Sequence, residues 1–494
     1  MSQQPVDIQF ALVSHTNNGK TTLARTLVGV DVGEVRDAAH VTVLAEAHVL
    51  QTSAAGDRLL LWDTPGFGDS VRLLKRLASS GNPIGWFMRE VFDRYRDRPF
   101  WLSQQALRAA KDAADVVLYL VNSSEDPRDA GYLAPEMKIL EWLGKPVVVL
   151  LNQLGPPRPD AQEQAEQARW KDYLDQFGIV RDVLALDAFA RCWVHEDVFY
   201  DRIARLVDEA KRPGYARLLA TWQEANLKRL HESLRLGAAQ VAAAARDSQA
   251  IEAEGKGNLF KSALKAVGLG KDEQKRQDAA MATLVERLNR RIAETTAALL
   301  RLHRVDPGEA GRINARVRDH FAVRAPVDKT QAGLLGAVVS GAATGLSADL
   351  MAGGLTLGGG ALLGALVGGL TMAGAAWGFN TTTERDRPSV QFADPFLRTL
   401  LVGAVLRYLA VAHFGRGRGQ FVEGEAPAFW QTEVEAALAR RETDPARLWK
   451  SVRDAADDDA AAQRVLEVLG PMTTDTLERL YPESAAHALS RQAA

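Results

Sequence analysis

Eight consecutive residues near the N-terminus have the types and the spacing that bind phosphate. The run from Ser14 to Thr21 reads SHTNNGKT and matches the pattern GxxxxGK[ST] except at its first position, where Ser14 replaces glycine. In this pattern Gly19 lets the backbone approach the phosphates, Lys20 reaches the β and γ phosphates, and Thr21 offers its hydroxyl to Mg²⁺. We expect Ser14 to strain the first turn mildly, because a Cβ there must accept a conformation that favours glycine.

A second pattern follows at the distance from the loop that a nucleotide site requires. The apolar run Leu59 to Trp62 ends in Asp63-Thr64-Pro65-Gly66, a DxxG sequence. An acidic residue at a strand end beside the loop can bind the Mg²⁺ shell, and the Gly66 N–H can sense a γ-phosphate. DxxG alone is common, but after a phosphate-binding loop it predicts a nucleotide-dependent switch.

The elements that position these motifs are predicted over residues 1–212, where short apolar β-rich runs alternate with helical patterns. This alternation is typical of an α/β fold in which helices connect parallel strands. Six strands are predicted, and they start at Ile8, Val41, Arg58, Asp115, Pro146 and Asp182. We therefore expect one doubly wound, mostly parallel P-loop domain. An aromatic-rich insertion at about 67–101 is either a nucleotide-gated docking surface or a segment that packs on the chain's own next domain.

From residue 213 onward the strand signal disappears, and a mainly α-helical domain is predicted. Segments rich in Ala, Leu, Glu, Arg and Gln predict long helices over Tyr215 to Glu254 and Lys271 to His303. Another apolar helix is predicted from Phe396 to Phe414. The first part of this domain is 213–330 and its C-terminal part is 380–494.

Between these two parts, residues 331–379 are crowded with Gly, Ala, Leu and Val and contain one charged residue, Asp349. The stretch is long enough for two membrane passes of about 20 residues each. Its glycines recur at four-residue spacing, which lets membrane helices approach closely, so a helical hairpin is predicted. The alternative is a soluble hairpin buried in the helical domain, because glycine and alanine favour insertion weakly and Asp349 is costly at depth.

The motifs of the first domain resemble those of the TrmE/Era-like P-loop GTPases, whose fold is Ras-like. The resemblance rests on Asn17-Asn18-Gly19-Lys20-Thr21, on Thr42 as the switch I threonine, and on Asp63 to Gly66. It implies that GTP is bound with Mg²⁺ and that Thr42 closes over the metal in the triphosphate state. It also implies that Asn17 can hold K⁺, as in members that use one. The whole layout looks like a bacterial group of GTPases with a C-terminal domain of unknown function.

Two positions depart from the GTPase pattern. Phe67 stands where Ras-type GTPases place a glutamine that orients water, so intrinsic hydrolysis should be slow and an activating group should come from a homodimer partner or another protein. After the fifth strand the expected NKxD is Asn152-Gln153-Leu154-Gly155, in which only Asn152 matches. The missing carboxylate removes a contact to guanine worth roughly 1 to 3 kcal/mol. GTP is favoured, and ATP or relaxed specificity stays open.

The motifs predict the individual residues of a nucleotide-binding site. The predicted catalytic residues are Lys20, Thr42 and Gly66, and the predicted metal ligands are Thr21, Thr42 and Asp63. The predicted nucleotide-binding residues are Asn17, Asn18, Gly19, Lys20, Thr21, Thr22, Asp63, Gly66 and Asn152.

Composition limits the partners and the compartment. The formal charge of −2 does not call for a nucleic-acid partner. The single Cys192 cannot form an internal disulfide, and the start MSQQPVDIQF lacks the features of a signal peptide. A cytoplasmic protein at the inner face of the cell membrane is therefore expected.

Two functions of different class remain. The first is a slow GTPase that acts as a membrane-associated switch or mechanochemical protein. The second is a nucleotide-gated scaffold that binds GTP or ATP and barely hydrolyses it, as Phe67 and the degenerate base motif would allow.

Overall fold

The computed structural model describes eleven stretches of the chain: residues 4–16, 18–28, 46–78, 98–152, 160–186, 192–251, 270–305, 377–380, 389–413, 428–441 and 444–490. The chain divides into two compact units. Unit 1 comprises Met1–Arg229, Ala412–Pro427 and Leu477–Ala494, and unit 2 comprises Leu230–Val411 and Ala428–Thr476. The sequence placed a boundary at residue 212, whereas unit 1 extends into the following helix and takes up two segments from the C-terminal part.

Unit 1 alternates strands with helices in chain order. Its elements are β1 Asp7–Ser14, α1 Lys20–Val28, β2 Glu46–Thr52, β3 Arg58–Asp63, α2 Ser70–Ala78, α4 Arg98–Arg108, the π-helical turn η1 Ala109–Ala113, β4 Val116–Asn122, α5 Leu133–Glu141, β5 Val147–Asn152, α6 Asp160–Leu174, β6 Val180–Ala185, α7 Trp193–Ala204, the first part of α8 Arg212–Arg246, and α17 Pro482–Ser490. All six predicted strands are present, although the part of the second one before Glu46 lies outside the described residues.

The six strands form one sheet in the order β2-β3-β1-β4-β5-β6. Only β2 runs antiparallel, against β3, and the other neighbours are parallel. The predicted mostly parallel, doubly wound fold is confirmed. Because β1 lies between β3 and β4, the ends of β1 and β3 that carry the two sequence motifs are adjacent.

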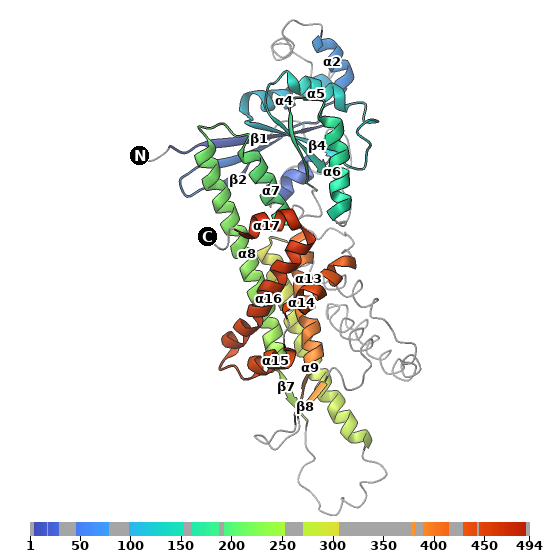
Figure 1. Ribbon diagram of the computed structural model, residues 1–494, viewed down its shortest axis with the longest axis vertical. Helices are drawn as coiled ribbons and strands as arrows, with labels where there is room; N and C mark the ends of the chain where they lie inside the picture. The colour runs from blue at the N-terminus through green and yellow to red at the C-terminus, as the bar shows by residue number, and fades with distance from the viewer. Residues whose placement is uncertain are drawn as a thin grey trace, which may run out of the picture. The chain divides into compact units, whose positions relative to one another are not determined.

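Helices cover both faces of this sheet, as Figure 1 shows. Apolar residues of α2, α4, α5 and α6 pack on one face, and those of α1, α7 and the start of α8 pack on the other. Strands buried on both faces must be apolar throughout, which is why β4 and β5 read as unbroken runs such as VVLYLV and VVVLL.

The start of α8 is held to the rest of unit 1 by an ion pair between the half-buried Arg217 and the buried Asp57. Arg217 donates to both carboxylate oxygens of Asp57 at 2.7 and 2.8 Å, and Asp57 also accepts from the Val6 N–H and the Ser53 hydroxyl. These donors, Arg217 above all, hold the pKa of the Asp57 carboxyl well below its usual range. Gly214 is required here, because a Cβ would lie 2.2 Å from Val6 Cγ2.

Unit 2 is mainly helical, as predicted, but it contains a small sheet. Its elements are the rest of α8, β7 Ser248–Ala250, α9 Gly270–Leu302, β8 Trp377–Asn380, β9 Ser389–Phe392, α13 Asp394–His413, α14 Ala428–Arg441, α15 Pro445–Arg453 and α16 Asp458–Leu480. The three strands pair antiparallel in the order β7-β9-β8. The helix predicted up to Glu254 is wrong beyond Arg246, because the chain enters β7 two residues later.

The apolar stretch 331–379 lies outside the described residues up to position 376. The helical hairpin predicted there is wrong for its last three residues, because they pair with β9 as part of β8. Within the described ranges, one helix, α13, is long and apolar enough to cross a membrane. Since 78% of its most apolar stretch is buried inside the protein, α13 has the burial expected of a core helix. It also contains Arg407, whose side chain is buried and donates to Gln240 Oε1 at 2.7 Å.

Candidate nucleotide-binding site

The phosphate-binding loop connects the end of β1 at Ser14 with the start of α1 at Lys20. Gly19 has a φ of +84°, a left-handed conformation that glycine adopts without steric cost. A Cβ at Gly19 would also lie 2.7 Å from Asn152 Nδ2. The predicted glycine is therefore required by both backbone conformation and space.

The predicted strain at Ser14 is wrong. Ser14 is the last residue of extended β1, and among the described residues the one non-glycine with a positive φ is Arg304. A serine can therefore occupy this position without the Cβ penalty that we expected. Its hydroxyl accepts a hydrogen bond from Lys20 Nζ at 2.8 Å.

The Lys20 side chain is buried at the loop. Its ammonium donates to Ser14 Oγ and, at 3.4 Å, to the carbonyl oxygen of His15. Burial lowers the pKa of Lys20 to about 8, and the carboxylates of Asp63 and Glu136 oppose this shift. An anion placed at the loop would favour the charged form of this side chain.

The second motif meets the first at the ends of β1 and β3. Asp63 ends β3, and its Oδ2 accepts a hydrogen bond of 2.7 Å from Thr21 Oγ1. Gly66 lies beside the ammonium, because a Cβ on it would be 3.0 Å from Lys20 Nζ and from Thr16 Cα. Four predicted site residues, Lys20, Thr21, Asp63 and Gly66, are thus brought together.

Thr21 and Asp63 also fit the implied Mg²⁺. A hydroxyl and a carboxylate, both oxygen donors, are the kind of ligand that Mg²⁺ takes in nucleotide sites. Their oxygens already lie within hydrogen-bond distance of each other, so one ion could contact both. Thr42, the third predicted ligand, lies outside the described residues, as does Asn17 with its predicted K⁺ site.

Asn18 and Asn152 hold the loop by side chains that point into the protein. Asn18 Nδ2 donates to the Leu120 carbonyl oxygen at 3.2 Å, and Asn152 Nδ2 donates to the Asn18 carbonyl oxygen at 2.9 Å. Asn152, predicted to read the base, is therefore also a tether between β5 and the loop, which we did not predict. The next three positions of the base motif lie outside the described residues. Thr22 is buried in α1.

Phe67 belongs to the core of unit 1. It is fully buried, and its N–H donates to the Ser14 carbonyl oxygen at 2.9 Å. Phe100, from the far end of the predicted insertion, is also buried, and the guanidinium groups of Arg72 and Arg76 lie over its ring. Phe100 thus packs in the core of unit 1 itself and not on the next domain. Positions 79–97 of the insertion lie outside the described residues.

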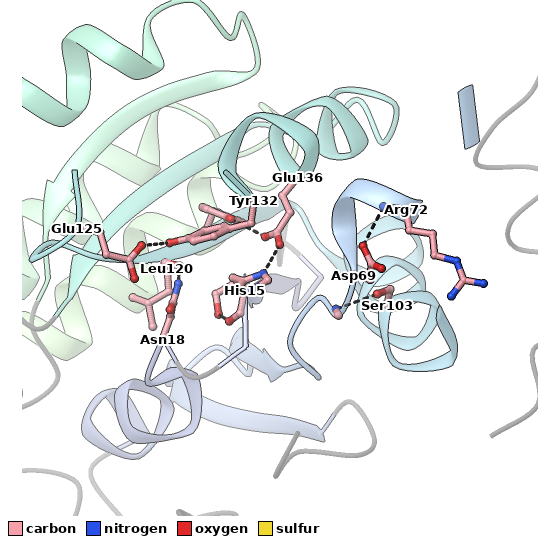
Figure 2. Close-up of polar contacts among 12 residues, drawn as sticks. His15, Asn18, Asp69, Arg72, Ser103, Leu120, Glu125, Tyr132 and Glu136 are labelled. Carbon is pink, nitrogen blue, oxygen red and sulfur yellow. Dashed lines mark hydrogen bonds and ion pairs between the residues drawn. The ribbon is translucent and has the colours of Figure 1, made fainter. Parts of the chain in front are cut away.

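Sequence reasoning missed a polar cluster behind the loop, drawn in Figure 2. His15 Nδ1 lies 2.7 Å from Oε1 of Glu136 on α5, and the His15 ring stacks on Tyr132 with centroids 4.3 Å apart. The Tyr119 hydroxyl donates to Glu136 Oε2 at 2.6 Å. The one available signal was Glu136 itself, an acidic residue within the apolar segment LAPEMKIL.

The sheet order, the glycine-dependent loop with Lys20, and the adjoining Asp63 and Gly66 define a P-loop GTPase domain. Comparison with protein families agrees, because residues 9–153 match the model described as 50S ribosome-binding GTPase. Residues 172–470, more than half of the chain, match the model of a domain of unknown function, DUF3482. The chain therefore belongs to the DUF3482 family and carries this domain behind a GTPase domain.

Several solved structures are similar to part of the chain. A variant of Era from Aquifex aeolicus bound to GDP and AlF4⁻ is 18% identical, with a TM-score of 0.28, over 41% of this chain and 57% of Era. Era in complex with MgGDPNP and a 16S ribosomal RNA fragment is 19% identical, with a TM-score of 0.28, over 42% and 58%. A variant of S. thermophilus NFeoB bound to GMPPNP is 19% identical, with a TM-score of 0.24, over 37% and 55%.

The chain thus spans a little more than half the length of each of these solved structures. No curated protein matches it.

Proposed function

We propose that this protein binds GTP between β1 and α1 and hydrolyses it slowly, as a switch whose state depends on the bound nucleotide. The observation that carries the proposal is the convergence of Lys20, Gly66 and the Thr21–Asp63 pair at the ends of two adjacent strands. These residues supply a cation, a glycine that lets the backbone come close and two oxygen ligands, which are the groups that a nucleotide polyphosphate with Mg²⁺ requires.

Each residue has a role that follows from its position. Lys20 would stabilise negative charge on the β and γ phosphates, and the close approach at Gly66 leaves room for its N–H to meet the γ-phosphate. Thr21 and Asp63 would hold Mg²⁺, which neutralises charge on the phosphate oxygens when bound. Phe67 offers no group that could orient water, so turnover should be slow without an activating partner, either a second copy of this chain or another protein.

Titrations of GTP binding, with phosphate release measured alongside, test this proposal, with Lys20→Ala as the test variant and Lys75→Ala, an exposed lysine of α2, as the matched control. We expect Lys20→Ala to weaken GTP binding by about tenfold to hundredfold, the equivalent of a lost charge-assisted hydrogen bond. The control should match the unaltered protein. Undiminished GTP affinity in Lys20→Ala would sink the proposal.

A nucleotide-gated scaffold is the second candidate, and the buried, apolar Phe67 favours it. The two functions differ in their response to a partner. Addition of lipid vesicles or of more protein should accelerate phosphate release from a turnover enzyme. A rate that stays at background under all these conditions, with GTP still bound tightly, would favour the scaffold.

We also propose that the protein associates with the inner face of the cell membrane through the part of the apolar stretch that precedes β8, residues 331–376. Support comes from the length of this apolar stretch, its four-residue glycine spacing and its single charge at Asp349. Centrifugation of a detergent-free lysate tests the idea. The full chain should sediment with membranes, and recovery of all of it in the supernatant would contradict membrane association.

A further inference from the structure

Glu136 is a fully buried carboxylate directly behind the phosphate-binding loop. Both of its oxygens have a partner at short distance: Oε1 faces His15 Nδ1 at 2.7 Å, and Oε2 accepts from the Tyr119 hydroxyl at 2.6 Å. A carboxylate is removed from water at a large free-energy cost unless such donors satisfy it. Burial of the Glu136 carboxylate therefore depends on the hydrogen bonds from His15 and Tyr119, and the position of the His15 ring depends on Glu136.

The His15 ring is fixed from a second direction. Tyr132, at the start of α5, stacks on it with an interplanar angle of 13°, and the Tyr132 hydroxyl donates to Glu125 Oε2 at 2.7 Å. Figure 2 shows both partners around the ring. The edge of the imidazole is held by Glu136 and its face by Tyr132, so the first turn of the loop is attached to α5 by side chains.

This turn presents the groups that hold Lys20. Ser14 Oγ lies 2.8 Å from Lys20 Nζ, and the carbonyl oxygen of His15 lies 3.4 Å from it. The Ser14 hydroxyl in turn donates to that same carbonyl oxygen. A shift of His15 would therefore move both acceptors of the Lys20 ammonium.

We propose that Glu136 and His15 are positioning residues for Lys20: Glu136 fixes the His15 ring, and the fixed turn sets the place of the Lys20 ammonium for a nucleoside di- or triphosphate. This inference rests on the proposed function, since it assumes that Lys20 contacts the phosphates. The contacts that carry it run from Glu136 on α5 to His15, and from the Ser14–His15 turn to Lys20. A cluster that only stabilises the fold would have no effect on nucleotide affinity in the folded protein.

Binding titrations of the full chain with GTP and GDP test the proposal. His15→Phe keeps a flat ring for Tyr132 and removes the Nδ1 donor, whereas His15→Asn keeps an amide N–H close to the place of Nδ1. Lys138→Ala is the control, because Lys138 is an exposed residue of the same helix α5 and its ion pair with Glu141 lies on the surface. We expect His15→Phe and Glu136→Gln to weaken GTP and GDP binding by about tenfold, equal to one hydrogen bond to a charged group.

Two further results are expected. His15→Asn should regain affinity to within about threefold of the unaltered protein, and Lys138→Ala should stay within about twofold. Ser14→Gly combined with Glu136→Gln should weaken binding by less than the product of the two single effects, because both act on the same ammonium. This combination leaves His15 in place and so keeps the test available if His15→Phe does not fold.

Two outcomes overturn the inference. One is a folded His15→Phe or Glu136→Gln variant with unchanged GTP affinity and a lowered midpoint of thermal unfolding, which would make the cluster purely structural. The other is full additivity of Ser14→Gly and Glu136→Gln. Lys20→Ala, measured in parallel, reports on the proposed function separately, since only that function predicts its loss of binding.

Discussion

The two units of the molecule bury charge in different ways. In unit 1 the carboxylate of Glu136 has partners at both oxygens, and those partners belong to the phosphate-binding loop and the adjoining strand. In unit 2 the guanidinium of Arg407 lies in the apolar helix α13 beside one neutral partner, Gln240, and burial alone lowers its pKa to about 10. We therefore expect the stability of unit 1 to depend on the charge of Glu136, and the stability of unit 2 to depend little on the charge of Arg407.

Removal of Glu136 should give the largest effect. Glu136→Leu leaves the Tyr119 hydroxyl and His15 Nδ1 without their acceptor in a buried place, so we expect the free energy of unfolding to fall by about 3 kcal/mol. Chemical denaturation, followed by a spectroscopic signal that reports on the unfolding of unit 1, measures this change. If the free energy of unfolding falls by less than about 1 kcal/mol, Glu136 contributes no more to stability than we expect of Arg407, and the comparison is wrong.

A second buried carboxylate of unit 1, Asp57, sharpens the comparison through pH. Its pKa is depressed in the folded state, mainly by Arg217, so its stabilising contribution is present above the unfolded value near 3.9 and is lost as pH falls through the folded value. Arg217→Met should cost about 2 kcal/mol at pH 7. The difference between this variant and the unaltered protein should shrink below about pH 4.

Unfolding curves from pH 7 down to about pH 2 would measure this difference. A difference that is constant with pH would show that Arg217 acts by packing and not through the Asp57 carboxylate.

Two helical glycines compare packing in the two units. Gly214→Ala in α8 should lower the free energy of unfolding by about 1 to 2 kcal/mol, because the new Cβ would meet Val6 Cγ2 and Asp57 Oδ1. Gly403→Ala in α13 would place its Cβ 3.9 Å from Arg407 Nη1, an ordinary contact distance, and should raise it by about 0.5 to 1 kcal/mol through helix propensity. Thermal unfolding of both variants checks the opposite signs, and equal signs would refute the packing argument.

Arg407→Met should have the smallest effect. Replacement of a buried charge by an apolar side chain of similar volume is often neutral or stabilising, so we expect a change within about 1 kcal/mol, in the stabilising direction. Chemical denaturation, followed by a spectroscopic signal that reports on the unfolding of unit 2, measures this change. A loss of about 3 kcal/mol or more would mean that Arg407 contributes as much as Glu136 and would break the comparison.

The sequence predicted unit 1 better than unit 2 for a physical reason. Strands such as β4 and β5 are buried on both faces, so they appear as unbroken apolar runs that a local pattern detects. The strands β7, β8 and β9 have three or four residues each, and Ser248 pairs with Gln391, far away in the chain. Such short strands are stabilised by pairing with distant segments, and they are too short to show a hydrophobic periodicity in the sequence.

The candidate site was predictable where a residue type is required by the phosphate. Gly19, Lys20, Thr21, Asp63 and Gly66 were found because their spacing alone indicates the chemistry. The tether from Asn152 to the loop and the cluster around Glu136 were missed, since they depend on which side chains meet across the sheet. The error at Ser14 has the same origin, because the strand continues to that residue through its pairing with Leu120 of β4.

The most direct test of the central claim, a P-loop GTPase with a guanine preference despite its incomplete base motif, is a competition experiment. A fluorescent GTP analogue bound to the full chain would be displaced by GTP, GDP, ATP and ADP in separate titrations. We predict that GTP and GDP displace it at concentrations at least about tenfold lower than ATP and ADP, as expected for one discriminating hydrogen bond. Equal displacement by ATP, or no binding of the analogue at all, would contradict the account.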